Sequence, residues 1–334
     1  NERVVTEVEH TIGYLDHPLN YGEFFATNFD GTRRKMIFGY RVGEKQSVSR
    51  ATKARPKRAS ARLIDGLPDD DKHILITSTP WTGQESMSDV LKLNVYTGKF
   101  VRVTRPPVVH ARVITDHTGQ PRFATGTNSK NHTLVYYRKG PNSDWELFDR
   151  VDEGGIVPLA FSADNSSVYV ADNSETSTYG IYEYNIETRK KKRIYHNAVV
   201  DPDDYYRTND RRGIYALVHY SDYPHYILLS KKYPEAELLK QLLASFPGAF
   251  VDITSTTKDG SQAIIHTSSD REPGTYYLLD TKKMGARHLL SARQWIQPEK
   301  MAAVHPKSFK ASDGQALHGY ITLPNGVEPK NLPM

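Results

Sequence analysis

The sequence predicts an all-β fold built from repeated four-stranded antiparallel sheets, which is the architecture of a β-propeller. Its 334 residues include 21 Tyr and 11 Phe, and its aromatic and β-branched residues occur in short runs. Such residues fit the pleated surface of a sheet. Polar turns recur at a nearly constant spacing, and two sets of short apolar runs keep the same register with those turns.

The polar turns mark the repeat. A turn, usually with Asp or Asn near a Gly, precedes a short strand-like run at six places: Asp30, Asp71, Gly119, Asn165, Arg212 and Gly260. From Asp71 onward the steps between turns are 48, 46, 47 and 48 residues. A propeller blade has four strands in about 40 to 50 residues, so each step corresponds to one blade.

The apolar runs supply the strands of each blade. Two runs follow the turns, the first at 73–79, 122–126, 168–172, 214–220 and 263–267, the second at 90–94, 134–138, 181–185, 226–230 and 276–280. Another run precedes the turn, as at 111–114 and 157–161, and a fourth run ends the unit at 100–104, 192–195 and 286–290. We therefore expect five blades between about 59 and 295.

The first unit looks incomplete, because 21–43 accounts for about two strands and residues 1–20 are hard to place. We expect the propeller to begin upstream of Asn1. A four-stranded sheet has two apolar faces that neighbouring blades cover. The alternative, a β-sandwich or two stacked β domains, rarely keeps one period through five units.

One segment departs from the strand pattern. Between Pro234 and Pro247, leucines at 238, 239, 242 and 243 have the spacing of one helix face. We expect a helix here that replaces or covers the outer strand of the fourth blade.

Charge and composition argue against several classes of partner. With 44 basic and 39 acidic residues, the net charge of +5 does not indicate nucleic-acid binding. A basic cluster is interpreted as a solvated loop, because no aromatic residue between 44 and 60 could stack on a base: Arg50, Lys53, Arg55, Lys57 and Arg58. No apolar run approaches the roughly 18 residues of a membrane helix. The absence of Cys fits a reducing cytosol or a periplasm, which leaves the compartment open.

The chain contains no recognisable catalytic motif. Gly-x-Ser-x-Gly is absent, and the nearest match to an oxyanion loop, His318-Gly319-Tyr320, lies in a strand-like run. The 13 histidines lack metal-binding spacing, so His110, His117 and His132 are interpreted as surface or packing residues. The acidic residues at 69–71 and 201–204 are interpreted as turn carboxylates. We expect no catalytic residue, metal or cofactor in this chain.

The last third of the chain resembles a known family. Residues 249–261 and 268–280 look like a late propeller blade of prolyl-oligopeptidase-type serine peptidases, such as acylaminoacyl peptidases and oligopeptidases. Residues 308–324 resemble the segment by which that family enters its α/β-hydrolase domain, with 331–334 just before the expected oxyanion strand. Earlier blades match as generic repeats.

The resemblance implies a domain organisation and a function. In that family the propeller has seven blades and caps a hydrolase domain that carries the Ser, Asp and His triad. It implies a propeller over 1–297 and, over 298–334, a linker with the first strands of the hydrolase domain. None of the triad residues can be placed in this sequence. The expected partners are the chain's own C-terminal hydrolase domain and small peptides whose entry the propeller restricts, so the chain alone should be inactive.

Two other functions stay open. A free-standing propeller that binds a protein or peptide would make the segment after Pro298 dispensable. A propeller enzyme with a metal-assisted or acid/base site, such as a lactonase or glycosidase, is the other alternative, and the scattered histidines argue against it. The fold does not choose among these functions, since propellers serve many.

Strand direction predicts which loops face the substrate. If the chain leaves the fourth strand of its last blade for the hydrolase domain, loops from strand two to strand three point the same way. The candidate segments are 80–86, 128–132, 173–176, 222–225 and 270–273. Turns such as Thr97-Gly98 lie at the opposite end. We predict that Arg271 and Glu272 hold a peptide terminus by a charge-assisted hydrogen bond. The alternative is an ordinary surface ion pair.

Overall fold

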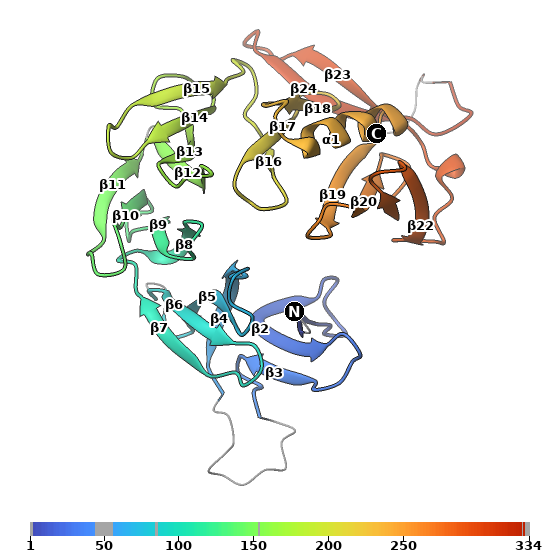
Figure 1. Ribbon diagram of the computed structural model, residues 1–334. Coiled ribbons are helices and arrows are strands. Elements are labelled where there is room, and N and C mark those ends of the chain that lie inside the picture. Colours follow the sequence, from blue (N-terminus) through green and yellow to red (C-terminus); the bar gives the residue numbers. More distant parts are fainter. Residues whose placement is uncertain (1–2, 44–55, 84–85, 153, 329, 331–334) are drawn as a thin grey trace. The chain divides into compact units, whose positions relative to one another are not determined.

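The structure is a computed structural model that describes residues 3–43, 56–83, 86–152, 154–328 and 330. Contacts divide the chain into two compact units, one comprising Asn1–Glu175 with Ile181–Lys192 and the other Thr176–Gly180 with Arg193–Met334. The predicted fold class is confirmed. The described residues form antiparallel, mostly four-stranded sheets, the blades of a β-propeller, in which neighbouring strands follow one another along the chain (Figure 1).

Four sheets lie in the first unit, apart from the ends of β14 and β15. The first sheet has three strands: β1 (Arg3–His10), β2 (Leu19–Asn28) and β3 (Lys35–Phe38). The other three sheets have four strands each: β4 (Ala59–Asp65), β5 (His73–Pro80), β6 (Asp89–Asn94) and β7 (Phe100–Thr104); β8 (Val109–Thr115), β9 (Pro121–Thr127), β10 (Thr133–Tyr137) and β11 (Glu146–Val151); β12 (Ile156–Phe161), β13 (Ser167–Asp172), β14 (Gly180–Asn185) and β15 (Lys191–Tyr195).

The second unit contains two blades and a terminal hairpin. Its elements are β16 (Asp204–Arg207), β17 (Ile214–Tyr220), β18 (Pro224–Leu228), α1 (Pro234–Ser245), β19 (Phe250–Thr256), β20 (Gln262–Ser268), β21 (Thr275–Asp280), β22 (Gly285–Ser291), the 3₁₀ turn η1 (Pro298–Lys300), β23 (Val304–Lys310) and β24 (Ala316–Thr322). Within the described residues, no helix is long and apolar enough to cross a bilayer.

The five blades expected between 59 and 295 are all present, whereas the sheet that precedes them differs from its prediction. This first sheet has three strands instead of about two, because β1 pairs with β2 from Arg3 opposite Asn28 to His10 opposite Leu19. Residues 11–18 separate these strands without a short hairpin turn. β1 also has no fully buried residue, so its apolar pattern is a weak signal.

The predicted helix is confirmed as α1, which stands where the fourth strand of the β16–β18 blade would be. Pro234 occupies its first turn, where the missing backbone N–H costs no helical bond. Leu239 and Leu242 are buried, and Leu238 and Leu243 pack beside them at the edge of the same core. This core lies between α1, the β16–β18 sheet and the β19–β22 sheet.

Apolar residues on both faces of a sheet enter different cores. In β5, Ile74 and Ile76 pack with Phe24 of the preceding sheet, whereas Leu75 packs with Val113 and Ala124 of the next one. This alternation follows from the two-residue period of a strand. For the β4–β7 sheet, it confirms the expectation that neighbouring blades cover both faces.

The predicted basic loop lies largely outside the described residues, which exclude Arg50, Lys53 and Arg55. Of its other members, Lys57 has its Nζ 5.6 Å from the centre of the Phe100 ring, and the carbonyl of Arg58 accepts a hydrogen bond from the backbone N–H of Trp81.

Candidate functional site at the loop ends of the sheets

The predicted substrate-facing segments connect the second and third strands of their blades. We call the end of a blade with this connection its loop end, and the opposite end its hairpin end. The connections are 80–86 between β5 and β6, of which 84 and 85 lie outside the described residues, 128–132 between β9 and β10, 173–176 between β13 and β14, 222–225 between β17 and β18, and 270–273 between β20 and β21. Because the strands are antiparallel, the turn at Thr97-Gly98 lies at the hairpin end of its own sheet.

In the second unit, the terminal hairpin β23–β24 contacts two loop ends. The backbone N–H of Val304 donates a hydrogen bond of 2.7 Å to Oδ2 of Asp270. The hydroxyl of Tyr320 donates one of 2.7 Å to the carbonyl of Asp222. The segments 222–225 and 270–273 therefore gather around the hairpin through which the chain leaves its last blade.

Arg271 and Glu272 do not form an ion pair with each other, which was the alternative interpretation of these two residues. Oε1 of Glu272 accepts hydrogen bonds from the backbone N–H of Gly274 at 3.2 Å and from Oγ1 of Thr275 at 2.8 Å. Its own backbone N–H donates to Oγ of Ser269. Glu272 thus shapes the loop. The Arg271 side chain is exposed, and no described residue pairs with its guanidinium.

A histidine pair lies beside segment 222–225. His219 and His225 face each other across the β17–β18 ladder, and their rings stack with centroids 5.1 Å apart. Asp222 Oδ1 lies 2.5 Å from Nε2 of His225, and this hydrogen bond is the main cause that lowers the pKa of Asp222. His219 is buried with Nδ1 unpartnered, and burial, followed by the charge of His225, lowers its pKa.

In the first unit, aromatic side chains gather at the loop end of the β4–β7 sheet. The Trp81 ring lies 5.4 Å from that of Tyr40 and 6.2 Å from that of Tyr21. Its indole N–H donates a 2.8 Å hydrogen bond to Oγ of Ser60, which fixes the ring although it is 44% exposed. His10 completes this aromatic cluster with its ring 5.2 Å from that of Tyr21. Such a rigid, half-exposed surface can stack on a ligand.

A fully buried carboxylate supports the aromatic cluster. Glu23 receives hydrogen bonds of 2.9 Å from Nε2 of His10 and from Nε of Arg41, and another of 3.0 Å from the backbone N–H of Arg41. The Arg41 guanidinium also lies 5.7 Å from the centre of the Tyr40 ring. A buried carboxylate must be paired, and these bonds meet that requirement. They also fix His10 and Arg41, which contact the rings of the cluster.

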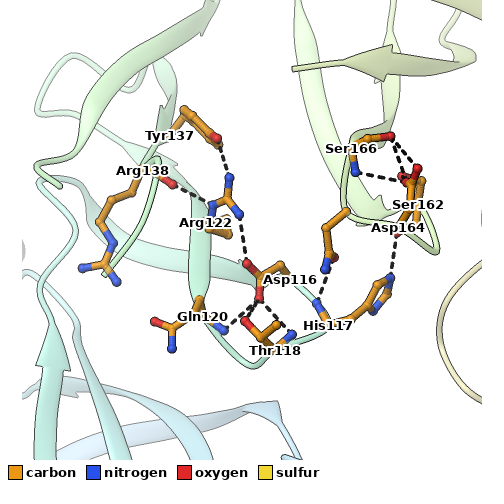
Figure 2. A network of polar contacts seen from close by, with 11 residues as sticks. Asp116, His117, Thr118, Gln120, Arg122, Tyr137, Arg138, Ser162, Asp164 and Ser166 are labelled. Atoms are coloured by element: carbon orange, nitrogen blue, oxygen red, sulfur yellow. Dashed lines mark hydrogen bonds and ion pairs between the residues drawn. The ribbon is translucent and has the colours of Figure 1, made fainter. Parts of the chain in front are cut away.

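The hairpin ends have a different chemistry, which Figure 2 shows for two neighbouring blades. Oδ1 of Asp116 accepts hydrogen bonds from Thr118 and from the backbone of Gln120, and Oδ2 pairs with Nη1 of Arg122 at 2.9 Å. Burial opposes ionisation, but the hydrogen bonds from Thr118 and Arg122 outweigh it and lower the pKa of Asp116. These contacts close the turn itself.

The same turn also joins its blade to the next. The backbone N–H of His117 donates to Oδ1 of Asn165 at 3.0 Å, and its Nε2 lies 2.9 Å from the carbonyl oxygen of Ser162 (Figure 2). These contacts agree with the interpretation of His117 as a surface or packing residue. In the second unit Asn209 and Thr257 make the equivalent contact at 3.1 Å. These polar contacts are structural.

Among the described residues, no group of three or more His, Cys, Asp or Glu side chains is placed to hold a metal ion. His132 accepts a hydrogen bond from Arg150, and its Nδ1 lies 3.7 Å from Oδ1 of Asp152. These are surface contacts, as interpreted for His132.

Sequence reasoning found the loop segments and missed the two clusters beside them. The histidine pair left a signal, because positions 219 and 225 are equally far from Asp222 at the centre of the connection. Two residues placed so face each other in a hairpin. The aromatic cluster left none, since its members come from separate segments: His10 ends β1, Tyr21 lies in β2, and Tyr40 and Trp81 follow β3 and β5.

No protein-family model matches the chain. No curated protein sequence matches it either. The chain is similar in structure to puromycin hydrolase, with a TM-score of 0.58 and 14% identity over 90% of this chain and 47% of that one. It is also similar to prolyl oligopeptidase B from Galerina marginata, with a TM-score of 0.55 and 10% identity over 98% of this chain and 46% of that one.

A third similar structure is a puromycin-hydrolysing peptidase from Mycobacterium tuberculosis, with a TM-score of 0.55 and 10% identity over 97% of this chain and 51% of that one. The chain spans about half the length of these proteins. At such identities the likeness concerns the fold. Together with the antiparallel blades, it shows that the chain has the fold of the propeller part of prolyl-oligopeptidase-family enzymes.

Proposed function

We propose that this chain is the substrate-gating propeller of a serine peptidase that hydrolyses small peptides. The catalytic Ser, His and Asp belong to an α/β-hydrolase domain that follows the propeller, with the boundary near residue 297. There the Ser hydroxyl attacks the peptide carbonyl and forms an acyl-enzyme, which water then hydrolyses. The propeller covers that site and admits peptides according to their size.

The observation that carries this proposal is the position of the β23–β24 hairpin. It contacts segments 222–225 and 270–273 through Tyr320 and Val304, so the chain leaves the propeller at the loop end of two blades. A domain that follows would then face these loops. The hairpin also exposes the pair Phe309 and Leu317, which lie opposite each other in its ladder and are 57% and 40% exposed. Such a surface favours coverage by another domain.

Arg271 is the residue that we expect to contact the substrate directly. Its guanidinium is exposed and has no partner among the described residues, so it is available to bind the C-terminal carboxylate of a peptide. Glu272 acts mainly by holding the loop, because its carboxylate already accepts hydrogen bonds from Gly274 and Thr275. In this assignment Arg271 binds the peptide directly, and Glu272 contributes by fixing the loop that carries Arg271.

Expression of the reading frame beyond Met334 tests the proposal. We expect a Gly-x-Ser-x-Gly motif within about 250 further residues and a protein that cleaves short chromogenic peptides. A fluorophosphonate probe should label it, and replacement of the motif Ser by Ala should abolish both signals. The 334-residue chain alone serves as the control and should neither cleave nor be labelled.

The outcomes separate the proposal from its alternatives. A stop codon near Met334, together with peptide binding by the chain alone, would favour a free-standing binding module, to which the exposed Trp81 surface is suited. Covalent labelling of the 334-residue chain would contradict the placement of the triad outside it. Stoichiometric Ca or Zn in the purified chain would revive a metal-dependent propeller enzyme.

A further inference from the structure

Two arginines of one sheet have opposite surroundings. Arg122 is fully partnered, with Nη1 on Asp116, Nη2 on the hydroxyl of Tyr137 and Nε on the carbonyl of Arg138. Arg138, which follows β10, is 4% exposed, and its Nε and Nη2 have no hydrogen-bond partner. Figure 2 shows its guanidinium turned away from the Asp116 network.

The charge of Arg138 is not balanced within the protein. Among the residues that the structure describes, no carboxylate forms an ion pair with it. Burial, and then the like charge of Arg122, lower the pKa of Arg138. An arginine nevertheless keeps its proton in a protein. A buried cation without an anion is strongly unfavourable.

An aromatic ring fixes the place of this guanidinium. The central carbon of the Arg138 guanidinium, Cζ, lies 5.3 Å from the centre of the Trp145 ring. The indole N–H of Trp145 donates a 3.0 Å hydrogen bond to Oγ1 of Thr104. Trp145 packs at the core between the β4–β7 and β8–β11 sheets. The ring face attracts the cation but offers no acceptor to its in-plane N–H groups.

The connection between β10 and β11, which begins next to Arg138, is exposed to solvent. Lys139 and residues 141–144 are exposed, and a Cβ added to Gly140 would meet no atom within 4 Å. This turn is closed by a 3.2 Å hydrogen bond from the backbone N–H of Ser143 to the carbonyl of Gly140. It can open without breaking a strand ladder.

We propose that Arg138 binds a small carboxylate anion at this seam between the two sheets. Nε–H and Nη2–H lie on the same edge of the guanidinium and point the same way, which matches the two oxygens of one carboxylate. Because Arg138 is only 4% exposed, the turn has to open to admit the anion, so we expect a molecule the size of formate or acetate rather than a segment of another protein. The bound anion balances the positive charge that Asp116 leaves uncompensated.

Thermal unfolding of the 334-residue chain tests this site, with sodium formate exchanged for sodium chloride at constant ionic strength. Formate should raise the Tm of the unmodified chain by about 3 to 6 °C at saturation, because a ligand of the folded state stabilises it. The control Lys139→Met removes an exposed charge next to the site and should keep the full rise. Arg138→Met should lose it. A rise retained in Arg138→Met, or no rise when formate replaces chloride with the unmodified chain, would overturn the proposal.

Fluorescence keeps the proposal testable even if Arg138→Met does not fold. Trp81 and Trp295 are 44% and 78% exposed, and their replacement by Phe leaves Trp145 as the one tryptophan. In this background, formate should change the Trp145 emission along a saturable curve, and chloride should not. A linear response to formate, or none, would contradict binding beside Trp145.

Discussion

Turns at the hairpin ends close through local carboxylate contacts, and two of them reach the neighbouring blade at the same spacing of 48 residues. The contacts at the loop ends differ from blade to blade. At the hairpin end, Asp116 bonds to Thr118 two residues away, and Asp164 and Asp259 do the same with Ser166 and Ser261. At the loop ends, the decisive contacts join residues far apart: Arg41 to Glu23 over 18 positions, Val304 to Asp270 over 34 and Tyr320 to Asp222 over 98.

This difference between the two ends explains how a repeated fold can contain a site that is present only once. Short turns of Asp with Ser or Thr close themselves, because the side chain bonds to the backbone two residues on. They can recur in each blade without regard to the rest of the molecule. The loop ends take their contacts from whichever segment reaches them, so each acquires its own chemistry. For this reason the proposed function is placed at the loop ends.

The largest expected effect is at the hairpin end. Asp116→Ala should lower the free energy of unfolding by about 3 to 5 kcal/mol. The Arg122 side chain is only 15% exposed, and the substitution would leave its positive charge without a carboxylate partner. Urea unfolding measures the loss. Asp259→Ala is the matched control, since its turn is exposed and lacks an arginine. An equal loss in both variants would mean that the turn rather than the buried pair matters.

The Asp116 carboxylate should also make the stability of the fold decrease at acid pH. The pKa of Asp116 is lowered from its ordinary value of 3.8 in the folded protein. Its contribution is therefore complete above pH 3.8 and is lost as the pH falls through the lower folded-state pKa. The difference in stability between the unmodified chain and Asp116→Ala should shrink below that pH.

The second effect tests whether a loop end can be held as firmly as a hairpin end. Glu23→Gln should cost about 2 to 4 kcal/mol, because the buried amide would leave Arg41 without its carboxylate and set an N–H group against a donor. Near-ultraviolet circular dichroism should also report the loosened aromatic cluster. Glu187→Gln, at an exposed turn, is the control. An unchanged unfolding midpoint for Glu23→Gln would remove the support assigned to the cluster.

The third effect tests the proposed function, in a longer protein that includes the proposed hydrolase domain. Arg271→Ala should raise KM for short peptides about 5- to 10-fold with kcat little changed, as expected for one lost charge-assisted hydrogen bond. Glu272→Ala should raise it as well, because the loop loses its bonds to Gly274 and Thr275. Thr97→Ala and Asp259→Ala, at hairpin ends, should not. Unchanged kinetics for both loop variants would reject the assignment.

The smallest effect is a pH dependence near neutrality. Burial lowers the pKa of His219 below its ordinary 6.5, so the folded state prefers the neutral ring. Stability should therefore be complete above pH 6.5 and decline as the pH falls below it. His219→Phe keeps the stack on His225 and should flatten this part of the curve, whereas His288→Phe, at an exposed position, should not. An identical decline in His219→Phe would show that His219 is not the group responsible.

The strands could be predicted closely from the sequence, because each blade repeats local signals. The run 214–220 is β17 itself, and 100–104 is β7. The helix between Pro234 and Pro247 was also predictable, since its leucines repeat at helical spacing. β1 was missed because it lacks buried residues and a short turn to β2.

The site was predictable to a lesser extent. Strand order alone assigns the five connecting segments to the loop ends, because antiparallel strands alternate in direction. It could not separate Arg271 from Glu272, which the turn at Ser269 and Gly274 does. Nor could it reveal that Asp222 and Asp270 meet the β23–β24 hairpin.

The blade repeat, the strand directions and the helix can all be derived from local patterns, since they depend on turn residues and periodicity within about 50 residues. The tertiary structure decided which side chains gather at the blade ends. It placed Trp81 on Tyr40 and Tyr21, Glu23 beneath them, and left Arg138 buried without an anion. The physical reason is that such contacts depend on the packing of separate segments, whose neighbours no local pattern encodes.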